Sequence, residues 1–454
     1  MMMKILVISR TPWRSDNSFG NSFTNIFGGI RDIELANIYC LSGFPDSNIC
    51  SRYFQITESM MLRSLIDSDE TPGKEVFHEI TAPLDMVDVE GRSANKFMNI
   101  AKRHRWQILF WVRELIWKIG RWKSPNLDQF VDEFNPDLII LPLYYQHYMN
   151  DIGLYVVNRA GKKMVAYVSD DVYTWSQFSY SPLYWIDRFF KRRTIKSAID
   201  HADLLYVISE RQREEYQEIF RLPCKVLYKC GEFQGEAPVK ETTEIPIRLV
   251  YTGNLGGGRW TTLVKIGDSI KEINRNGVRL ILDIYSLTPV TKAMRNRLDD
   301  GVNVFFNGAL AAADVDSVQE SADVLVHAES FERKDFLAAR LSFSTKIVDY
   351  LHHARCIFAV GAGECASIEY LEVNDAGLVA TSEQQIGEKL KMIVESPAII
   401  REFGNRAYAC GKRNHRSDKV KTMLKTDLRS VLDGRQIDPK NSLNKSTYSE
   451  GSSS

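Results

Sequence analysis

The sequence predicts an α/β protein with two Rossmann-like, doubly wound domains that face a central cleft. The chain has 454 residues, a usual length for two domains. Short apolar, β-branched runs alternate with helical patterns in two successive series, as parallel sheets require. Between the series, residues 232–246 are polar, contain two prolines and lack periodicity, which is typical of a linker.

The predicted N-terminal domain covers residues 1–231. Its expected strands are 4–8, 36–41, 136–142, 163–168, 203–209 and 224–228. The loop 9–25 follows the first strand and contains Gly20 and Asn21, where backbone N–H groups could approach a ligand. An ordinary connecting loop is the alternative. Asp170 and Asp171 follow the strand 163–168, at the edge where such sheets bind ligands.

Residues 96–123 form a basic insertion that is rich in tryptophan. It holds Trp106, Trp111, Trp117 and Trp122, four of the eight tryptophans, among several lysines and arginines. One interpretation is a helix at a membrane interface beside anionic lipids. The other is a helix that packs its rings on the sheet and turns its cations to water. No nucleic-acid motif accompanies the segment, so nucleic acid is not an expected partner.

The predicted C-terminal domain covers residues 247–410. Its expected strands are 247–251, 280–285, 302–306, 322–327, 356–360 and 378–380. A helix is expected at about 261–274, and a long loop at 328–343. Residues 411–433 are expected to form a helix that packs back toward the N-terminal domain. Residues 434–454 are polar and predicted to be disordered.

Composition excludes several classes of protein. Lys+Arg and Asp+Glu are equal at 58 each, so a general polyanion binder is not indicated. The seven cysteines are scattered without a C-x-x-C pair, which argues against zinc and disulfides and for a reducing cytoplasm. We expect no signal peptide, because the apolar run 5–8 is too short, and no transmembrane helix, because no uninterrupted apolar stretch reaches roughly 18 residues. We expect a cytoplasmic protein that can also lie at the inner face of the cell membrane.

The stretch Ser344 to Leu351 carries the sharpest functional signal. It predicts the start of a helix, with Ser344 or Thr345 as N-cap. Lys346 and Asp349 are three residues apart and share one side of that helix. A lysine at a helix start suits a phosphate, and a carboxylate one turn later suits a ribose diol. The alternative is a surface helix with a charge pair.

Other nucleotide motifs fail on inspection. Residues 253–259 are glycine-rich but lack the terminal Gly-Lys-Ser/Thr of a P-loop. Residues 361–366 match a loose dinucleotide fingerprint, yet they occur late in the domain. Asp314 and Asp316 are better explained as a helix cap than as a metal site. His147, His201, His352 and His353 have no convincing ligand partners, so no metal is predicted.

From Ile247 to about Gly411 the chain resembles the C-terminal domain of B-fold (GT-B) glycosyltransferases, particularly the retaining family four. The resemblance is carried by 253–259, by the strand 322–327 with an acid after it, and by Ser344–Leu351. Three positions depart from that pattern. Asn254 replaces a basic residue, Asp349 replaces a glutamate, and Gly20 stands alone where a glycine pair is usual.

The resemblance implies a hexosyltransferase-type enzyme that uses a nucleotide-diphosphate sugar, UDP-linked by first expectation. The acceptor would be lipid-linked or a polysaccharide of the cell envelope, and the transfer would proceed with retention. The expected catalytic residues are Arg259, Lys346, Glu332 (or Glu329), Asp170 and Asp171. The expected donor-binding residues are Gly20, Asn21, Gly257, Gly258, Tyr285, Asn307, Gly308, Ser344, Thr345, Asp349, Gly361 and Gly363. No cofactor is expected, and an anionic membrane surface is a further candidate partner.

Two other functions remain open. A hydrolysing nucleotide-sugar epimerase would use the same fold and donor. A non-catalytic partner protein would explain the departures at Asn254 and Asp349.

Overall fold

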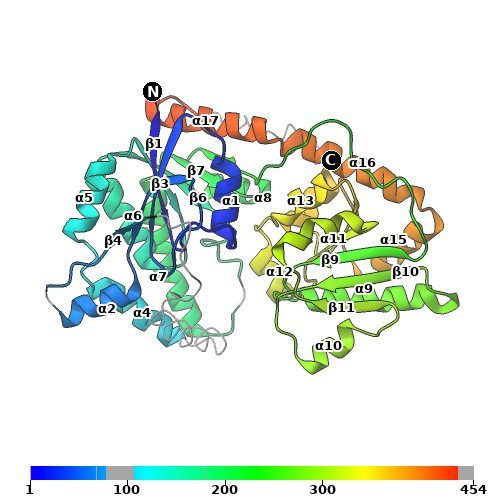
Figure 1. Cartoon of the computed structure of the whole chain (residues 1–454). Coiled ribbons are helices and arrows are strands. Elements are labelled where there is room, and N and C mark those ends of the chain that lie inside the picture. The colour runs from blue at the N-terminus through cyan, green and yellow to red at the C-terminus, as the bar shows by residue number, and fades with distance from the viewer. Residues whose placement is uncertain (1, 68, 78–106, 178, 438–454) are drawn as a thin grey trace, which may run out of the picture.

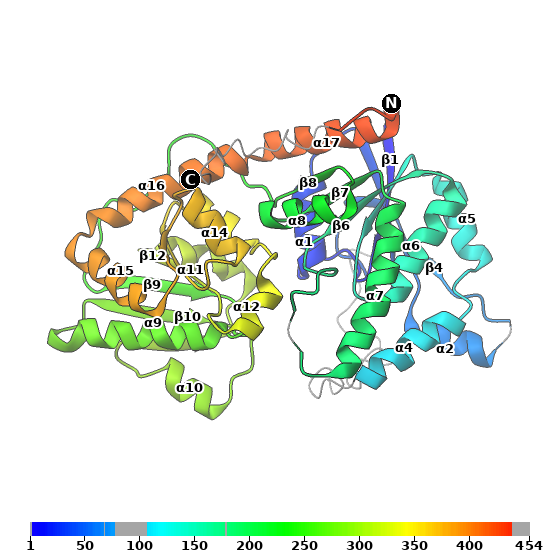
Figure 2. The same ribbon diagram turned by 180° about the vertical axis from the view of Figure 1, so that it is seen from behind.

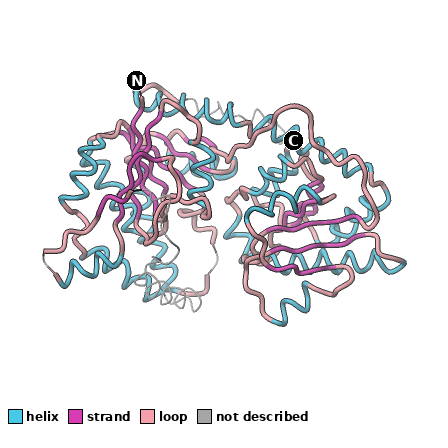
Figure 3. Tube along the Cα trace, viewed as in Figure 1, coloured by secondary structure: helices cyan, strands magenta, loops and turns pink. Residues whose placement is uncertain are grey.

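Two sheets, one mostly and one wholly parallel and each flanked by helices, form the two halves of the molecule (Figures 1 and 2). The computed structural model describes residues 2–67, 69–77, 107–177 and 179–437. Residues 96–106, with Trp106, and residues 438–454 lie outside this range, so the predictions made for them are not addressed. Figure 3 shows the strands at the centre of each half, with helices around them.

The N-terminal sheet has eight strands in the order β4-β3-β2-β1-β5-β6-β7-β8. They are β1 (Met3–Ser9), β2 (Ile33–Tyr39), β3 (Cys50–Gln55), β4 (Lys74–Val76), β5 (Leu138–Pro142), β6 (Lys163–Val168), β7 (Leu204–Val207) and β8 (Cys224–Val226). Among the strands of this sheet that the structure describes, only β3 and β4 pair antiparallel. The strand order reverses between β1 and β5, which makes this the switch point of a doubly wound sheet.

The helices of this half are α1 (Ser18–Phe27), α2 (Glu58–Ile66), α4 (Gln107–Ile119), α5 (Pro125–Phe134), α6 (His147–Ala160), α7 (Pro182–Asp200) and α8 (Glu210–Phe220). The predicted loop 9–25 is wrong in its second part, because α1 already begins at Ser18. Asn17 caps this helix, since its Oδ1 accepts a hydrogen bond from the N–H of Gly20 at 2.7 Å. A recognisable N-cap residue therefore marked the boundary.

The C-terminal sheet is parallel throughout, in the order β11-β10-β9-β12-β13-β14. Its strands are β9 (Ile247–Thr252), β10 (Leu280–Tyr285), β11 (Val304–Gly308), β12 (Val324–Ala328), β13 (Cys356–Val360) and β14 (Leu378–Ala380). Its helices are α9 (Arg259–Ile273), α10 (Lys292–Leu298), α11 (Val315–Ser321), α12 (Arg333–Ala339), α13 (Lys346–His352), α14 (Ala366–Val373), α15 (Glu383–Glu395) and α16 (Ala398–Asn414), with 3-10 turns η2 (Asn274–Asn276) and η3 (Ala312–Asp314). Helix α12 lies inside the predicted long loop 328–343.

The last helix, α17 (Ser417–Asp433), returns to the N-terminal half and lies along its edge (Figures 1 and 2). Asp427 on this helix pairs with Lys225 of β8 at 2.7 Å and accepts a hydrogen bond from the hydroxyl of Tyr206 at 2.9 Å. Lys225 and Asp427 are both buried. The chain thus closes on the half from which it started.

Between the halves, direct contacts line one side of the gap. Arg211 of α8 lies 2.8 Å from Glu369 of α14, and Arg340 pairs with Glu215 of α8. The Ser209 hydroxyl donates to the carbonyl of Leu341 at 2.7 Å. These contacts give the two halves a defined relation without merging their sheets.

The described part of the tryptophan-rich segment packs inward. Trp117 and Trp122 are buried, and Trp117 stacks on Tyr148 of α6 with ring centroids 4.2 Å apart. The Nε1 of Trp111 donates to Asp187 of α7 at 2.9 Å. The rings of Trp117 and Trp122 therefore do not lie on the surface of the protein. No described helix is long and apolar enough to cross a bilayer.

Candidate active site

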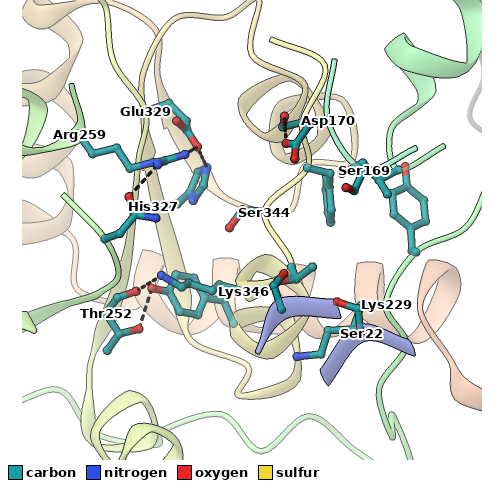
Figure 4. A pocket seen from close by; sticks show the side chains of 18 of the residues that line it. Ser22, Ser169, Asp170, Lys229, Thr252, Arg259, His327, Glu329, Ser344 and Lys346 are labelled. Atoms are coloured by element: carbon teal, nitrogen blue, oxygen red, sulfur yellow. Dashed lines mark hydrogen bonds and ion pairs between the residues drawn. The ribbon is translucent and has the colours of Figure 1, made fainter. Parts of the chain in front are cut away.

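A cavity of about 350 Å³ lies between the two halves, where strands of both sheets end (Figure 4). The N-terminal half contributes Ser18 and Ser22 of α1, Ser169 and Asp170 after β6, and Lys229. The C-terminal half contributes Thr252, Arg259, His327, Glu329, Ser344, Thr345 and Lys346. Thr252 ends β9 and Glu329 follows β12, the neighbouring strands between which this sheet reverses its order. Switch points are where open α/β sheets bind ligands.

Arg259 begins α9 and faces a buried carboxylate. Its Nη2 lies 2.9 Å from Oε1 of Glu329, and its Nη1 donates to Oδ1 of Asn254 at 3.0 Å. Burial raises the pKa of Glu329, whereas Arg259 and Lys346 oppose that shift. Asn254, the departure from the family pattern, therefore orients Arg259 instead of adding a charge.

Lys346 begins α13 and points into the same cavity as Arg259 (Figure 4). Its Nζ donates to the carbonyl of Thr252 at 2.8 Å. Burial, together with the positive charge of Arg259, lowers the pKa of Lys346 to about 8. Two poorly solvated cations therefore share one space, and an anion placed between them would relieve their repulsion.

The N-terminus of α13 is a weaker anion-binding group than the sequence predicted. Helix α13 has seven residues, and Thr345 at its N-cap makes no side-chain capping bond. The N–H of Ser344 is already used, because it donates to the hydroxyl of Ser367 at 2.9 Å. The cationic side chains, more than the end of the helix, make this region attractive to anions.

His327 is a site residue that the sequence reasoning missed. Its ring is buried in β12, with Nε2 at 3.7 Å from Oε1 of Glu329. Among the described residues, this nitrogen has no hydrogen-bond partner. Burial, reinforced by Arg259 and Lys346, lowers the pKa of His327 to about 3. The ring is therefore neutral at pH 7, and one nitrogen can bond to an occupant of the cavity.

The opposite wall belongs to the N-terminal half. Asp170 lines the cavity, and its Oδ1 accepts a hydrogen bond from the hydroxyl of Ser342 at 2.8 Å. Lys229 also lines the cavity and lies 2.6 Å from Oδ1 of Asp349. Asp349 itself borders a neighbouring hollow that also contains Asn21. A signal for Lys229 existed, since it follows a predicted strand at the sheet edge.

Two predicted catalytic carboxylates lie elsewhere. Asp171 is buried, and its Oδ1 accepts hydrogen bonds from the N–H groups of Tyr173 and Thr174 at 3.1 and 2.8 Å. It thus fixes the loop after β6 and does not line the cavity. Glu332 is exposed at the start of α12, also outside the cavity. Glu329 takes the position after β12 that the sequence left open between these two glutamates.

The predicted glycines act through the backbone. A Cβ on Gly20 would lie 2.0 Å from the carbonyl oxygen of Arg14, so this glycine allows a close chain approach. Gly258 has φ of 74° at the start of α9, next to Gly257 with φ of 61°. A Cβ on Gly361 would lie 2.8 Å from Cβ of Glu329. None of these, nor Gly363, is among the residues that line the cavity.

The remaining predicted donor contacts end neighbouring strands but do not line the cavity. Tyr285 ends β10, and its hydroxyl accepts a hydrogen bond from Arg248 at 3.4 Å. Asn307 in β11 donates to Asp283 at 3.0 Å, and Gly308 has φ of 76°. These residues are placed beside the switch point, on the β10 side of β9.

The arrangement suits an anion. No group of three or more metal-ligating side chains gathers in the described part of the chain. All seven cysteines are free and buried. The charges that face the cavity are fixed by partners, Arg259 by Glu329 and Lys346 by Thr252. Such preorganised cations can stabilise developing negative charge.

No family model and no curated protein sequence matches this chain. Among solved structures, it is similar to Anabaena Alr3699/HepE in complex with UDP, with a TM-score of 0.61 and 12% identity over 94% of this chain and 100% of that chain. For sucrose-phosphate synthase from Thermosynechococcus elongatus, the TM-score is 0.61 and the sequence identity is 11%, over 95% of this chain and 100% of that chain. For the pneumococcal O-GlcNAc transferase GtfA in complex with UDP and GlcNAc, the TM-score is 0.56 and the sequence identity is 12%, over 95% of this chain and 99% of that chain. These likenesses confirm the predicted fold class, the two-sheet GT-B architecture.

Proposed function

We propose that this protein is a glycosyltransferase that takes its sugar from a nucleotide-diphosphate donor, in the first place a UDP-sugar. The observation that carries the proposal is the convergence of Arg259 and Lys346 on one cavity at a sheet switch point. Similar structures that contain UDP, those of HepE and GtfA, support the choice of nucleotide.

In this proposal the departing diphosphate lies between Arg259 and Lys346. Charge develops on its oxygens as the glycosidic bond breaks, and the two cations stabilise it without a metal. Glu329 keeps Arg259 in place and offers its second carboxylate oxygen to a sugar hydroxyl. His327, neutral and without a partner among the described residues, contributes one hydrogen bond to the donor. Transfer with retention follows if the leaving phosphate takes the acceptor proton.

Two roles require a rearrangement or an approach from the other half. Asp349 can bind the ribose only if it gives up Lys229, which lies 2.6 Å away. Asp170 faces the cations from the opposite wall and is placed to contact the transferred sugar or the acceptor hydroxyl (Figure 4). We propose a lipid-linked or polysaccharide acceptor. Closure of the halves would bring both walls onto the substrates.

The experiment combines binding and turnover. A thermal-shift screen against nucleotide sugars in EDTA should select one donor, and chromatography should then follow its consumption with and without acceptors. Acceptor-dependent release of UDP supports the proposal. Turnover without acceptor to a free, epimerised sugar would favour a hydrolysing epimerase. Binding without turnover, with cellular glycans unchanged by Lys346→Ala, would favour a non-catalytic partner protein.

A further inference from the structure

A second cavity, of about 630 Å³, lies between α4, α6 and α7 in the N-terminal half. This volume is in the range of small-ligand pockets. Its walls are aromatic, formed by Trp111, Trp117, Trp122 and Tyr148, and the large aliphatic and aromatic side chains at its rim are Leu115, Ile186 and Phe190. It shares no lining residue with the cavity between the halves. It therefore requires an explanation of its own.

Two polar side chains of this second cavity, Glu114 and His147, are already bonded within the protein. Glu114 accepts hydrogen bonds from the N–H groups of His147 and Tyr148 at 3.3 and 3.2 Å, and burial raises its pKa to about 7. The Nδ1 of His147 lies 2.5 Å from the hydroxyl of Thr194. The Nε1 of Trp117, which also lines the cavity, has no partner among the described residues. A hydrocarbon chain needs only the apolar walls, which make up the larger part of the lining side chains named above.

Two apolar stripes meet at the rim. On α4, Leu115 is 54% exposed and stands between Val112 and Ile119, which continue the stripe at helical spacing. On α7, Ile186 and Phe190 are 48% and 55% exposed. Side chains i, i+3 and i+7 share one helix face, so each helix turns a continuous apolar surface to solvent. Exposed apolar surface around a cavity marks a binding site for an apolar partner.

Charges of both signs lie around the cavity, since Glu114, Asp151 and Asp187 line it together with Lys118. Lys118 lines the cavity, and Lys123 lies 5.4 Å from the ring centroid of Trp122 in its wall. Lys191 pairs with the lining residue Asp187 at 2.5 Å. Lys191 is thus already paired, whereas Lys118 and Lys123, which also act on Asp151, are the ammonium groups that a phosphate at the mouth of the cavity would meet.

The second cavity lies beside the first along the carboxyl edge of one sheet. Helix α6 follows β5, and Asp170 follows β6, and these two strands are direct neighbours. Adjacent strands are about 4.8 Å apart. Arg188 on α7 donates to the carbonyl of Thr174 at 3.1 Å, so α7 also holds the loop that carries Asp170. A chain held here would have its head group near the sugar-transfer cavity.

We propose that the cavity between α4, α6 and α7 binds the hydrocarbon chain of a phosphate-bearing lipid, the chemistry of a lipid-linked acceptor. Binding of the chain stands on this cavity alone. Its assignment to the acceptor rests on the proposed function.

The test titrates dodecyl phosphate, below its critical micelle concentration, into the full-length protein by calorimetry and tryptophan fluorescence. We expect saturable binding of one molecule per chain with a change in tryptophan emission. Phe190→Ser and Ile186→Ser should each weaken binding by about fivefold or more, because they remove apolar contact area. Leu287→Ser, an equally apolar change at a site 80% exposed in the other half, is the matched control and should leave binding unchanged.

Several outcomes overturn the proposal. These are equal binding of inorganic phosphate, displacement by free sugars, or equal affinities of the Phe190→Ser and Leu287→Ser variants. Sedimentation with phosphatidylglycerol vesicles without binding of monomeric dodecyl phosphate would make the stripes a membrane-docking face and refute the chain-binding cavity. If a serine variant of the rim fails to fold, Ile186→Trp takes its place. The larger side chain narrows the mouth of the cavity and should also weaken binding of dodecyl phosphate. UDP affinity is measured on every variant, so loss of the lipid site and failure of the nucleotide site give separate signals.

Discussion

At the scale of single residues, the two cations Arg259 and Lys346 are partly buried in the cavity wall, so water solvates their charges poorly. Glu329 compensates Arg259 directly, whereas the only hydrogen-bond partner of Lys346 among the described residues is the carbonyl of Thr252. A hydrogen bond between charged groups contributes about 1.5–3 kcal/mol. The two cations are therefore expected to dominate the affinity for a diphosphate.

Lys346→Ala should weaken UDP binding by roughly 10- to 100-fold, the equivalent of one charge-assisted hydrogen bond. Isothermal titration calorimetry in EDTA measures this directly. Lys334→Ala, which removes an exposed lysine of α12, is the control and should bind as the wild type does. Equal affinity of the Lys346 and Lys334 variants would exclude the proposed phosphate contact.

The pH dependence of UDP binding follows from Lys346. Its pKa is lowered to about 8, so the ammonium form is lost as pH rises through that value, well before an ordinary lysine is neutralised. The diphosphate binds the charged form, so affinity should be highest near pH 7, where Lys346 is still mostly charged and the terminal phosphate of UDP is mostly ionised. It should then fall by up to about tenfold per pH unit above pH 8. A flat profile from pH 7 to 10 would contradict the prediction.

His327 makes stability depend on pH with a defined sign. The pKa of His327 is about 3 in the folded protein, compared with 6.5 when the ring is exposed. Below pH 6.5, the ring therefore binds a proton in the unfolded chain but stays neutral in the folded protein. Stability is therefore lost as pH falls. Relative to His327→Leu, the wild type should lose about 1.4 kcal/mol per pH unit between pH 6 and 4 in urea denaturation. The two proteins are compared because Glu114, whose pKa is raised in the folded protein, makes stability rise as pH falls. This opposite effect is present in both proteins and cancels in the difference.

Sequence reasoning found the residues that local spacing marks and missed those that tertiary structure places. Lys346 and Arg259 could be predicted, since each begins a helix after a recognisable strand or turn. His327 could not, because an inward-facing histidine in a buried strand looks like core. The choice between Glu329 and Glu332 depended on where the strand ends, which a single sequence does not define to the residue.

At the scale of elements, the ends of β12 and β13 position the buried carboxylate. The N–H of Glu329 donates to the carbonyl of Val360 at 2.8 Å, and Gly361 then passes directly beside the Glu329 side chain. There is no space for a Cβ at this crossing. The glycine at position 361, part of the loose dinucleotide fingerprint in the sequence, is therefore required by packing against Glu329.

Gly361→Ala should disturb Glu329 and through it Arg259. The new Cβ would lie 2.8 Å from Cβ of Glu329 and 3.0 Å from its carbonyl oxygen, so relief requires a main-chain shift. We expect about 1–3 kcal/mol of destabilisation and weaker UDP binding. Gly387→Ala in α15, where no atom lies within 4 Å, should instead be neutral or slightly stabilising. Thermal unfolding of both variants would reject the argument if their melting temperatures coincided.

Strand elements could be predicted because buried parallel strands are continuous apolar runs, as in Ile5 to Ile8. Short or polar elements could not. Helix α12 has seven residues within a polar segment, and β4 has three. The tryptophan-rich segment was ambiguous, because a ring can serve a core or a membrane equally. Its packing against α6 and α7 depends on contacts between residues far apart in the sequence.

At the scale of the whole molecule, α17 joins the end of the chain to the first half. Asp427→Ala would leave Lys225 charged and buried, with Tyr206 also losing its partner. Removing one member of a buried pair costs about 3–5 kcal/mol. Asp418→Ala on the same helix removes an exposed carboxylate and should cost less than about 1 kcal/mol. Similar urea midpoints for the two variants would show that α17 does not stabilise the N-terminal half.

The overall plan, two doubly wound sheets around a cleft, was predictable because strand–helix alternation repeats on both sides of a polar linker. What the sequence lacked was the side of each element that faces the cleft. Asp349 shows this, since the helix was expected but its contact with Lys229 from the other half was not. Contacts of this kind decide which predicted residues meet in one cavity.

The most direct test is a crystal structure of the protein grown with UDP in EDTA. Electron density for the diphosphate should lie between the two halves, with oxygens within hydrogen-bond distance of both Arg259 and Lys346. Density for UDP elsewhere on the molecule, or a diphosphate that touches neither side chain, would contradict it.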